Sequence, residues 1–169
     1  MAQAKARPNI VQQEVARLLI RGSGGALEVM PLEREDDLDL VASIPQDGPG
    51  VLGIRIETAS RLTEGRFGKW LVIDAVAPGA QFQNDPRSVY IFGQFPDGER
   101  AFTGSVFVVP AALLQVRPGI KGRSARISFR ARLDAVNQEW SNFAVAPHQV
   151  GAQLLDLLHD MPQYREQAA

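Results

Sequence analysis

Cysteine is absent from the chain, which excludes disulfide bonds and metal sites built on thiolates. No apolar run reaches the roughly 18 residues that a membrane-spanning helix requires. Residues 1–7 also lack the apolar core of a signal peptide. We therefore predict a cytoplasmic protein that has no contact with a membrane.

Lysine is scarce as well. The chain has 15 arginines but only three lysines, at positions 5, 69 and 121. A catalytic mechanism that needs a lysine therefore has few candidates in this sequence.

The remaining composition is that of an ordinary globular protein, with 45% hydrophobic and 22% charged residues over a length of 169. A chain of this length suits one compact domain whose core needs no covalent cross-links. We predict a single domain over residues 9–162, preceded by a flexible segment at 1–8 and followed by a flexible tail at 163–169.

Hydrophobic periodicity predicts a mixed α/β fold. Asn9 and Gln12 have the pattern of a capping box, so a helix should begin at Ile10. A last helix should start at Pro147 and run to Met161, where apolar residues recur at helical spacing. Between them we predict strands at 26–30, 38–44, 51–58, 70–76, 89–95, 102–109 and 124–133, a polar loop at 79–87 and a helical turn at 111–114. The expected architecture is one domain whose central mixed β-sheet is flanked by an N-terminal and a C-terminal helix.

Charge is unevenly distributed along the chain, although the formal net charge is only −1. Six acids and a single base lie between residues 28 and 39. Residues 117–132 contain no acid and six bases: Arg117, Lys121, Arg123, Arg126, Arg130 and Arg132. Gly119 and Gly122 should let this basic segment approach a partner closely. The segment suits a nucleic-acid backbone, a solvent-facing strand, or a contact with the acidic segment of a second copy.

Three acids can converge on one place in the predicted fold. Asp39 and Glu57 lie on predicted strands, and pairing of these strands would bring the two carboxylates together. Arg55 shares a face with Glu57, because residues two apart in a strand point the same way. Glu14, in the apolar face of the first helix, can reach the same place. Buried carboxylates need a cation, so the cluster predicts either a divalent metal site or a salt-bridge network in which Arg55 pairs with Asp39 or Glu14.

These segments resemble the PD-(D/E)XK, or restriction-endonuclease-like, superfamily, and above all its small bacterial members. Residues 13–19 resemble the family's opening helix with its acid, and 37–41 resemble the strand that carries the first essential aspartate. Residues 53–60 resemble the strand that follows it, and 105–114 resemble a later strand with its short helix. Loosely, the resemblance covers residues 9–115.

The resemblance implies a role for each charged residue of the cluster. Asp39 would be the metal-binding aspartate and Glu14 an auxiliary ligand, so Mg²⁺ or Mn²⁺ is the expected cofactor if the protein is an active nuclease. Arg55 stands where a second ligand is expected, and Glu57 stands where the family has a lysine. Arginine stays protonated and cannot act as a base, although it can stabilise negative charge in a transition state. Lys69 is the one lysine placed to substitute.

We therefore expect a nuclease-like domain, derived from metal-dependent phosphodiester hydrolases that act on DNA, with impaired catalysis. The sequence leaves two alternatives open. One is a non-catalytic nucleic-acid-binding domain that uses the basic segment, and the other is a protein-interaction module such as a homodimer. A nuclease should lose its activity on Asp39→Ala, whereas a nucleic-acid-binding domain should lose affinity with rising salt and on Arg126→Glu/Arg130→Glu.

Overall fold

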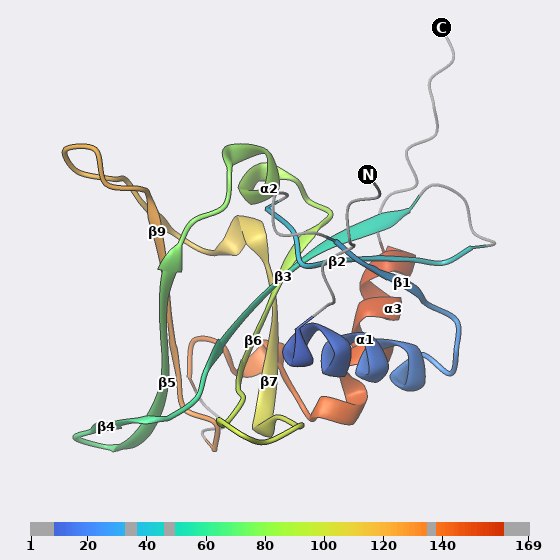
Figure 1. The fold of residues 1–169 in the computed structure, drawn as a ribbon, viewed down its shortest axis with the longest axis horizontal. Coiled ribbons are helices and arrows are strands. Elements are labelled where there is room, and N and C mark those ends of the chain that lie inside the picture. Colours follow the sequence, from blue (N-terminus) through green and yellow to red (C-terminus); the bar gives the residue numbers. More distant parts are fainter. Residues whose placement is uncertain (1–8, 33–36, 46–49, 135–137, 161–169) are drawn as a thin grey trace, which may run out of the picture.

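Two β-sheets and a pair of packed helices make up the computed structural model, which describes residues 9–32, 37–45, 50–134 and 138–160 (Figure 1). The first sheet has six strands in the order β1 (Glu28–Pro31), β2 (Leu40–Ser43), β3 (Val51–Ala59), β6 (Ser88–Gln94), β7 (Thr103–Pro110) and β10 (Ala144–Val145). The second sheet has four strands in the order β4 (Thr63–Gly65), β5 (Gly68–Val76), β9 (Arg126–Ala131) and β8 (Val116–Arg117).

The first sheet is mixed. Its strands pair antiparallel except for β3 and β6, which run parallel. The connection between these two strands contains β4, β5 and a short helix, α2 (Ala80–Asn84). The sheet therefore places β2, β3 and β6 side by side at its centre, with β3 flanked by both.

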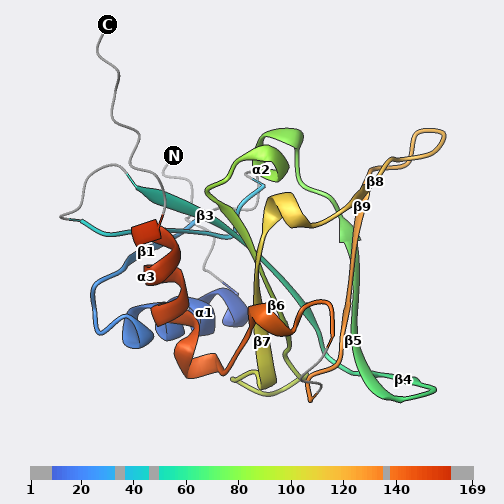
Figure 2. The same cartoon turned by 180° about the vertical axis from the view of Figure 1, so that it is seen from behind.

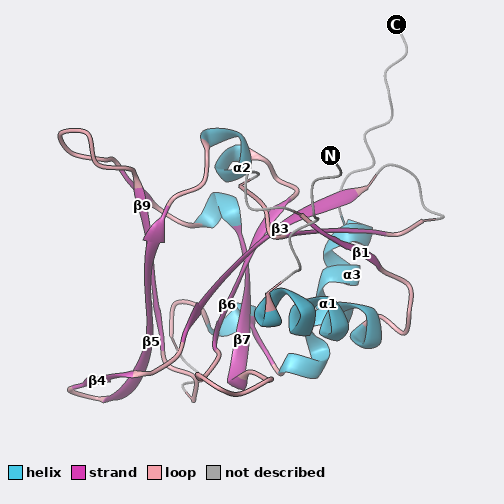
Figure 3. Cartoon of the chain, viewed as in Figure 1, coloured by secondary structure: helices cyan, strands magenta, loops and turns pink. Residues whose placement is uncertain are grey.

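The two long helices, α1 (Ile10–Gly22) and α3 (Val150–Asp160), pack against each other and cover one face of the first sheet (Figures 2 and 3). The predicted capping box is present, since the Asn9 side chain accepts from the Gln12 backbone and the Gln12 side chain accepts from the Asn9 backbone. Three short 3₁₀ turns complete the described elements: η1 (Ala111–Leu113), η2 (Ser141–Phe143) and η3 (Pro147–Gln149). Among the described helices, none has both the length and the apolar character needed to cross a membrane.

Two hydrophobic cores lie on opposite faces of the first sheet, because successive strand residues point to opposite sides. Ile54 and Ile91 face the helices. Tyr90 and Phe92 face the second sheet, where Phe92 stacks on Phe129 of β9 at a centroid distance of 4.1 Å. The side chains of β3 that alternate with Ile54 therefore belong to the layer between the two sheets.

The predicted helices and the main strands are confirmed, but the single central sheet is wrong. The segments predicted as strands at 70–76 and 124–133 contain β5 and β9 of the second sheet. In β5 only alternate residues such as Leu71 and Ile73 are buried, whereas in β6 almost every residue is buried. A strand with one exposed face belongs at the surface of the molecule, and this pattern distinguishes β5 from a central strand.

Other sequence predictions differ in detail. The polar loop predicted at 79–87 contains α2, whose Gln83 is buried. The last helix begins with the 3₁₀ turn η3 before α3. The flexible segments predicted at 1–8 and 163–169, the end of the predicted last helix at Met161, and the acids within 33–36 lie outside the described residues.

Candidate functional site

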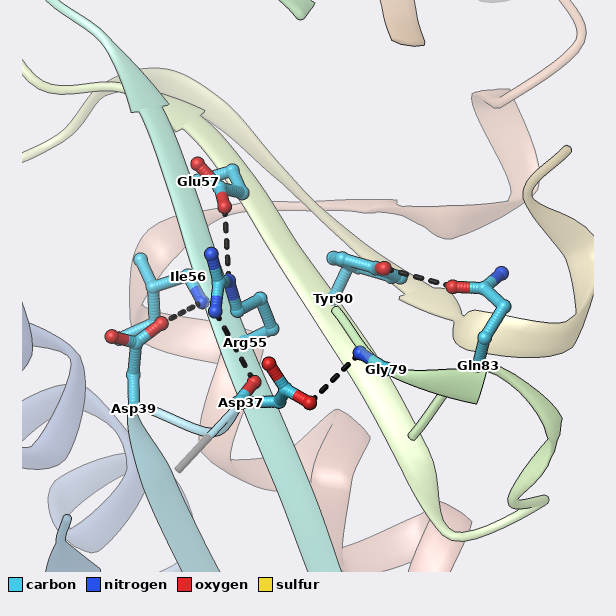
Figure 4. Close-up of polar contacts among 8 residues, drawn as sticks. All are labelled: Asp37, Asp39, Arg55, Ile56, Glu57, Gly79, Gln83 and Tyr90. Carbon is cyan, nitrogen blue, oxygen red and sulfur yellow. Dashed lines mark hydrogen bonds and ion pairs between the residues drawn. The ribbon is translucent and has the colours of Figure 1, made fainter. Parts of the chain in front are cut away.

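Asp39 lies just before β2 begins, beside the neighbouring strand β3 (Figure 4). Its backbone N–H donates to the Ile54 carbonyl at 2.8 Å, and its carboxylate Oδ2 accepts from the backbone N–H of Ile56 at 2.7 Å. The β2–β3 ladder ends at the pair Leu40–Ile54, while β3 continues to Ala59. The carboxylate thus satisfies a backbone donor of β3 that β2 is too short to reach.

Arg55 and Glu57 lie together on β3, on the face toward the second sheet. Arg55 Nε donates to Glu57 Oε1 at 3.0 Å, and Arg55 Nη1 donates to the Asp37 carbonyl at 3.3 Å (Figure 4). Both charged side chains are largely shielded, with exposed fractions of 25% for Arg55 and 18% for Glu57. A salt bridge is therefore present at this place, but it joins Arg55 to Glu57 and not to Asp39 or Glu14 as the sequence predicted.

Asp39 reaches β3 between Arg55 and Glu57, because its carboxylate accepts from the backbone N–H of Ile56. Burial raises the pKa of the Glu57 carboxyl above its ordinary value, and the hydrogen bond and charge of Arg55 oppose that rise. The negative charge of Asp39 adds to the increase in the Glu57 pKa. The structure therefore brings Asp39, Arg55 and Glu57 together, as the sequence predicted.

Glu14 forms an ion pair within its own helix. It is buried on α1, where both of its carboxylate oxygens accept from the Arg17 guanidinium at 2.6 and 2.7 Å. The helix α1 covers the face of the first sheet that carries Ile54, whereas Glu57 points to the opposite face. Glu14 and Glu57 therefore lie toward different faces of the sheet, while α1 reaches Asp39 through Gln12, whose side chain donates to the Asp39 carbonyl at 3.4 Å. The prediction that Glu14 joins the cluster stays a prediction.

Three further residues complete the surroundings of Arg55, and the sequence analysis did not identify them as site residues. Asp37 Oδ2 accepts from the Gly79 N–H at 2.8 Å, which ties the start of β2 to the segment before α2 (Figure 4). Tyr90, opposite Arg55 in the parallel β3–β6 pairing, donates its hydroxyl to Gln83 Oε1 at 2.9 Å. Burial raises the pKa of the Tyr90 phenol. These contacts join the start of β2 and the strand β6 to the segment around α2, and local sequence patterns do not reveal them.

Among the described residues, the acids around Asp39 already have partners. The Oδ2 atom of Asp39 is engaged by a backbone N–H, and the Glu57 carboxylate is paired with the Arg55 guanidinium. Within the described residues, no group of three or more His, Asp or Glu side chains is arranged to hold a metal ion. The lysine proposed as a substitute, Lys69, is exposed in the β4–β5 hairpin and lies 3.7 Å from Glu64 in an ion pair.

The basic segment forms a second candidate site. On β9, Ile127 and Phe129 are buried against the first sheet while Arg126 and Arg130 are exposed on the outer face, as the alternating pattern predicted. We define the arginine face as the outward side chains of β5, β8 and β9: Val72, Asp74, Val76, Arg117, Arg126 and Arg130.

The individual arginines of this region have different partners. Arg126 donates to the Asp74 carboxylate at 2.9 Å, and Arg132, which follows β9, donates to Asp134 at 3.3 Å. The Arg130 guanidinium lies over the ring of Trp70 at 4.3 Å from its centroid, a cation–π contact that orients the guanidinium.

Three basic residues of the same region lie on or beside a projecting hairpin. The strands β8 and β9 are joined by residues 118–125, which we call the β8–β9 loop and which extends away from both sheets (Figures 1 and 2). Arg117 at its base and Lys121 and Arg123 within it are exposed. In the described part of the chain, none of these three forms an ion pair with an acid.

Two candidate sites of opposite character therefore exist on this chain. The carboxylate cluster around Asp39 is satisfied internally by backbone donors and by Arg55, while the β8–β9 loop presents positive charge to solvent. Comparison with protein-family models, with curated proteins and with solved structures found no match to this chain.

Proposed function

We propose that this protein is a nucleic-acid-binding domain of restriction-endonuclease-like ancestry that does not cleave its ligand. It binds the phosphate backbone with the arginine face and the β8–β9 loop. The observation that carries the proposal is the charge of this surface. Five basic side chains of the described residues gather there with a single acid, Asp74, on the same face: Arg117, Lys121, Arg123, Arg126 and Arg130.

The arrangement of these charges favours a polyanion as the partner. Arg117 stands directly opposite Arg126 in the β8–β9 pairing, and like charges at such positions repel each other. Phosphate groups placed between the two guanidinium groups relieve that repulsion. Binding also releases counterions from the nucleic acid, which supplies most of the affinity of sequence-independent binding.

The proposed ancestry is supported by the positions of the segments that resemble nucleases. The helix α1 covers the sheet, β2 lies next to β3, and β7 is followed directly by the turn η1. The start of β2 at Asp39, beside β3, is where the metal site of such an enzyme is expected. Arg55 occupies this position as the partner of Glu57, which supports a domain that has lost metal-dependent cleavage.

The proposal is tested by measuring the binding of a fluorescent DNA duplex by anisotropy over a series of salt concentrations. Affinity should fall steeply with salt, with a slope of roughly −0.9 for each phosphate that the protein neutralises. Arg117→Ala/Arg130→Ala should weaken binding and make that slope less steep by about 2, because two fewer phosphates are neutralised. The matched control, Arg61→Ala/Arg100→Ala, removes the same charge from the β3–β4 and β6–β7 connections and should bind like the unmodified protein.

A second variant should strengthen the binding of nucleic acid instead of weakening it. Asp74→Asn removes the acid that holds Arg126, so the freed guanidinium should bind phosphate and affinity should rise. Asp97→Asn changes the charge equally in the exposed β6–β7 loop and should leave affinity unchanged. If no duplex or single strand binds at low salt, the proposal is refuted. Sedimentation of the protein alone tests the homodimer alternative, which stays a prediction.

A further inference from the structure

The tip of the β8–β9 loop is a tight turn with a defined backbone. The Arg123 N–H donates to the Ile120 carbonyl at 3.2 Å, and the two residues between them, Lys121 and Gly122, have φ values of +48° and +77°. Positive φ at both central positions is the signature of the two-residue type I′ hairpin turn. Gly119 lies so close to the Arg123 backbone that a Cβ atom there would overlap it. The loop is thus a preformed hairpin.

Lys121 is an unusual residue for the first central position of such a turn. Glycine, asparagine and aspartate are preferred there because other side chains are strained at positive φ. Lys121 is the only residue other than glycine with a positive φ in the described part of the chain. Backbone strain of this kind is found at functional sites more often than elsewhere, which makes the positive charge at this turn a candidate for selection by function.

Ile120, next to Lys121, is the most exposed large apolar side chain among the described residues, with 72% of its surface accessible. It belongs to neither hydrophobic core. A Cβ atom at the neighbouring Gly122 would meet nothing within 4 Å, so the space beside the turn is open. The hairpin therefore ends in one aliphatic side chain surrounded by the charges of Lys121 and Arg123.

We propose that the β8–β9 loop enters the minor groove of duplex DNA and that Ile120 inserts between two base pairs as an apolar wedge. This inference rests on the proposed function. Wedges of this type partly unstack a base step and bend the duplex, and neighbouring cationic side chains hold the adjacent phosphates. Lys121 and Arg123 flank the wedge, and Arg117 lies at the base of the same hairpin.

The positions of the other charges favour a duplex over a lipid surface. The basic residues do not surround the tip alone, since Arg126 and Arg130 continue the same track along β9. These two are four positions apart along the strand, which corresponds to about 13 Å. A duplex bent at the tip can contact this whole track, whereas a membrane surface touched by the tip would meet only the loop.

The test uses the full chain and a duplex of about 25 base pairs that carries a donor and an acceptor fluorophore at its two ends. The unmodified protein and Ile120→Leu should both bind the duplex and shorten its end-to-end distance. Ile120→Ser should still bind with nearly the same dependence on salt but should lose the bend. Because Ile120 is exposed and outside the cores, the urea midpoint of each variant should match that of the unmodified protein, which excludes misfolding as the cause.

The other outcomes separate the two proposals. Binding without any bend by the unmodified protein refutes the wedge and leaves the proposed function standing. Absence of binding at low salt refutes both. In a parallel measurement with vesicles of phosphatidylcholine and phosphatidylserine, binding that is lost in Ile120→Ser while duplex bending persists in that variant also refutes the wedge, because it assigns Ile120 to a lipid surface.

Discussion

Replacing Lys121 with glycine should make the protein more stable and a weaker ligand of nucleic acid at the same time. The left-handed conformation of Lys121, at φ +48°, costs an L-residue roughly 1–2 kcal/mol. Glycine removes this strain, but the greater freedom of glycine in the unfolded chain costs about 0.4–1 kcal/mol. The free energy of unfolding should therefore rise by about 0.5–1 kcal/mol.

The same substitution removes a positive charge from the tip of the β8–β9 loop. The slope of log affinity against log salt should become less steep by about one unit, because the protein neutralises one phosphate fewer. Urea unfolding gives the change in stability, and anisotropy over a salt series gives the change in affinity. Exchange of the Arg123 amide, which is bonded to the Ile120 carbonyl, reports the opening of the turn itself.

Gly122→Ala is the matched control, because it introduces strain at φ +77° and leaves every charge in place. It should lower the stability of the turn by roughly 1–2 kcal/mol. The reasoning is refuted if Lys121→Gly lowers stability, or if it raises stability with no effect on affinity and salt dependence. The first result would mean that the turn is not strained, and the second that the charge at the tip has no partner.

Three more substitutions test other parts of the structure. Asp39→Ala should lower the free energy of unfolding by about 1–3 kcal/mol in urea titrations, because the Ile56 N–H loses its acceptor. Asp39→Asn keeps an acceptor oxygen and should lower that free energy less, so equal losses in the two variants would contradict this role. Glu57 has a pKa raised above its ordinary value of 4.5, so its protonation favours the folded state below that pH and this contribution fades as pH rises through the raised pKa. In unfolding experiments at several pH values, Glu57→Gln should therefore show a smaller fall in stability as pH rises than the unmodified protein. An identical dependence of stability on pH in the two proteins would contradict this. Gly151→Ala should destabilise the protein by about 1–3 kcal/mol in thermal or urea unfolding, because its Cβ would lie 2.5 Å from the Leu19 carbonyl oxygen where α1 and α3 meet. An unchanged stability would show that the two helices can separate at little cost.

The sequence predicts the elements of this fold better than their arrangement. The start of α1 is encoded locally by Asn9 and Gln12, and the alternation in β9 is encoded by Ile127 and Phe129 between exposed residues. The division into two sheets is not local. The strand β5 pairs with β4, which directly precedes it, and with β9, which lies fifty or more residues later in the chain. The pairing with β9 is supported by contacts between the sheets, because it buries Phe129 against Phe92.

The candidate site was likewise predictable only where it depends on segments that are close in the sequence. The proximity of Asp39 and Glu57 follows from neighbouring strands with short connections, which sequence patterns indicate well. The partner of Glu14 was missed because Arg17 lies one helical turn away, and an ion pair within α1 satisfies the carboxylate without any contact with the sheet. The exposure of Ile120 was not predicted, because an isolated apolar residue in a loop has no periodicity.

The internal partners of the charged residues indicate where an external partner is expected. Around Asp39 the negative and positive groups satisfy one another, so a ligand that bound there would first have to break the ion pair between Arg55 and Glu57. At the arginine face the charges are less fully satisfied. Arg126 pairs with Asp74, but Arg117 stands opposite Arg126 without an ion pair among the described residues, and Lys121 is held in a strained conformation. These arrangements destabilise the free protein, and a bound polyanion offsets the repulsion between the charges. The surface that binds the ligand is therefore expected on the second sheet, on the opposite side of the first sheet from the helices.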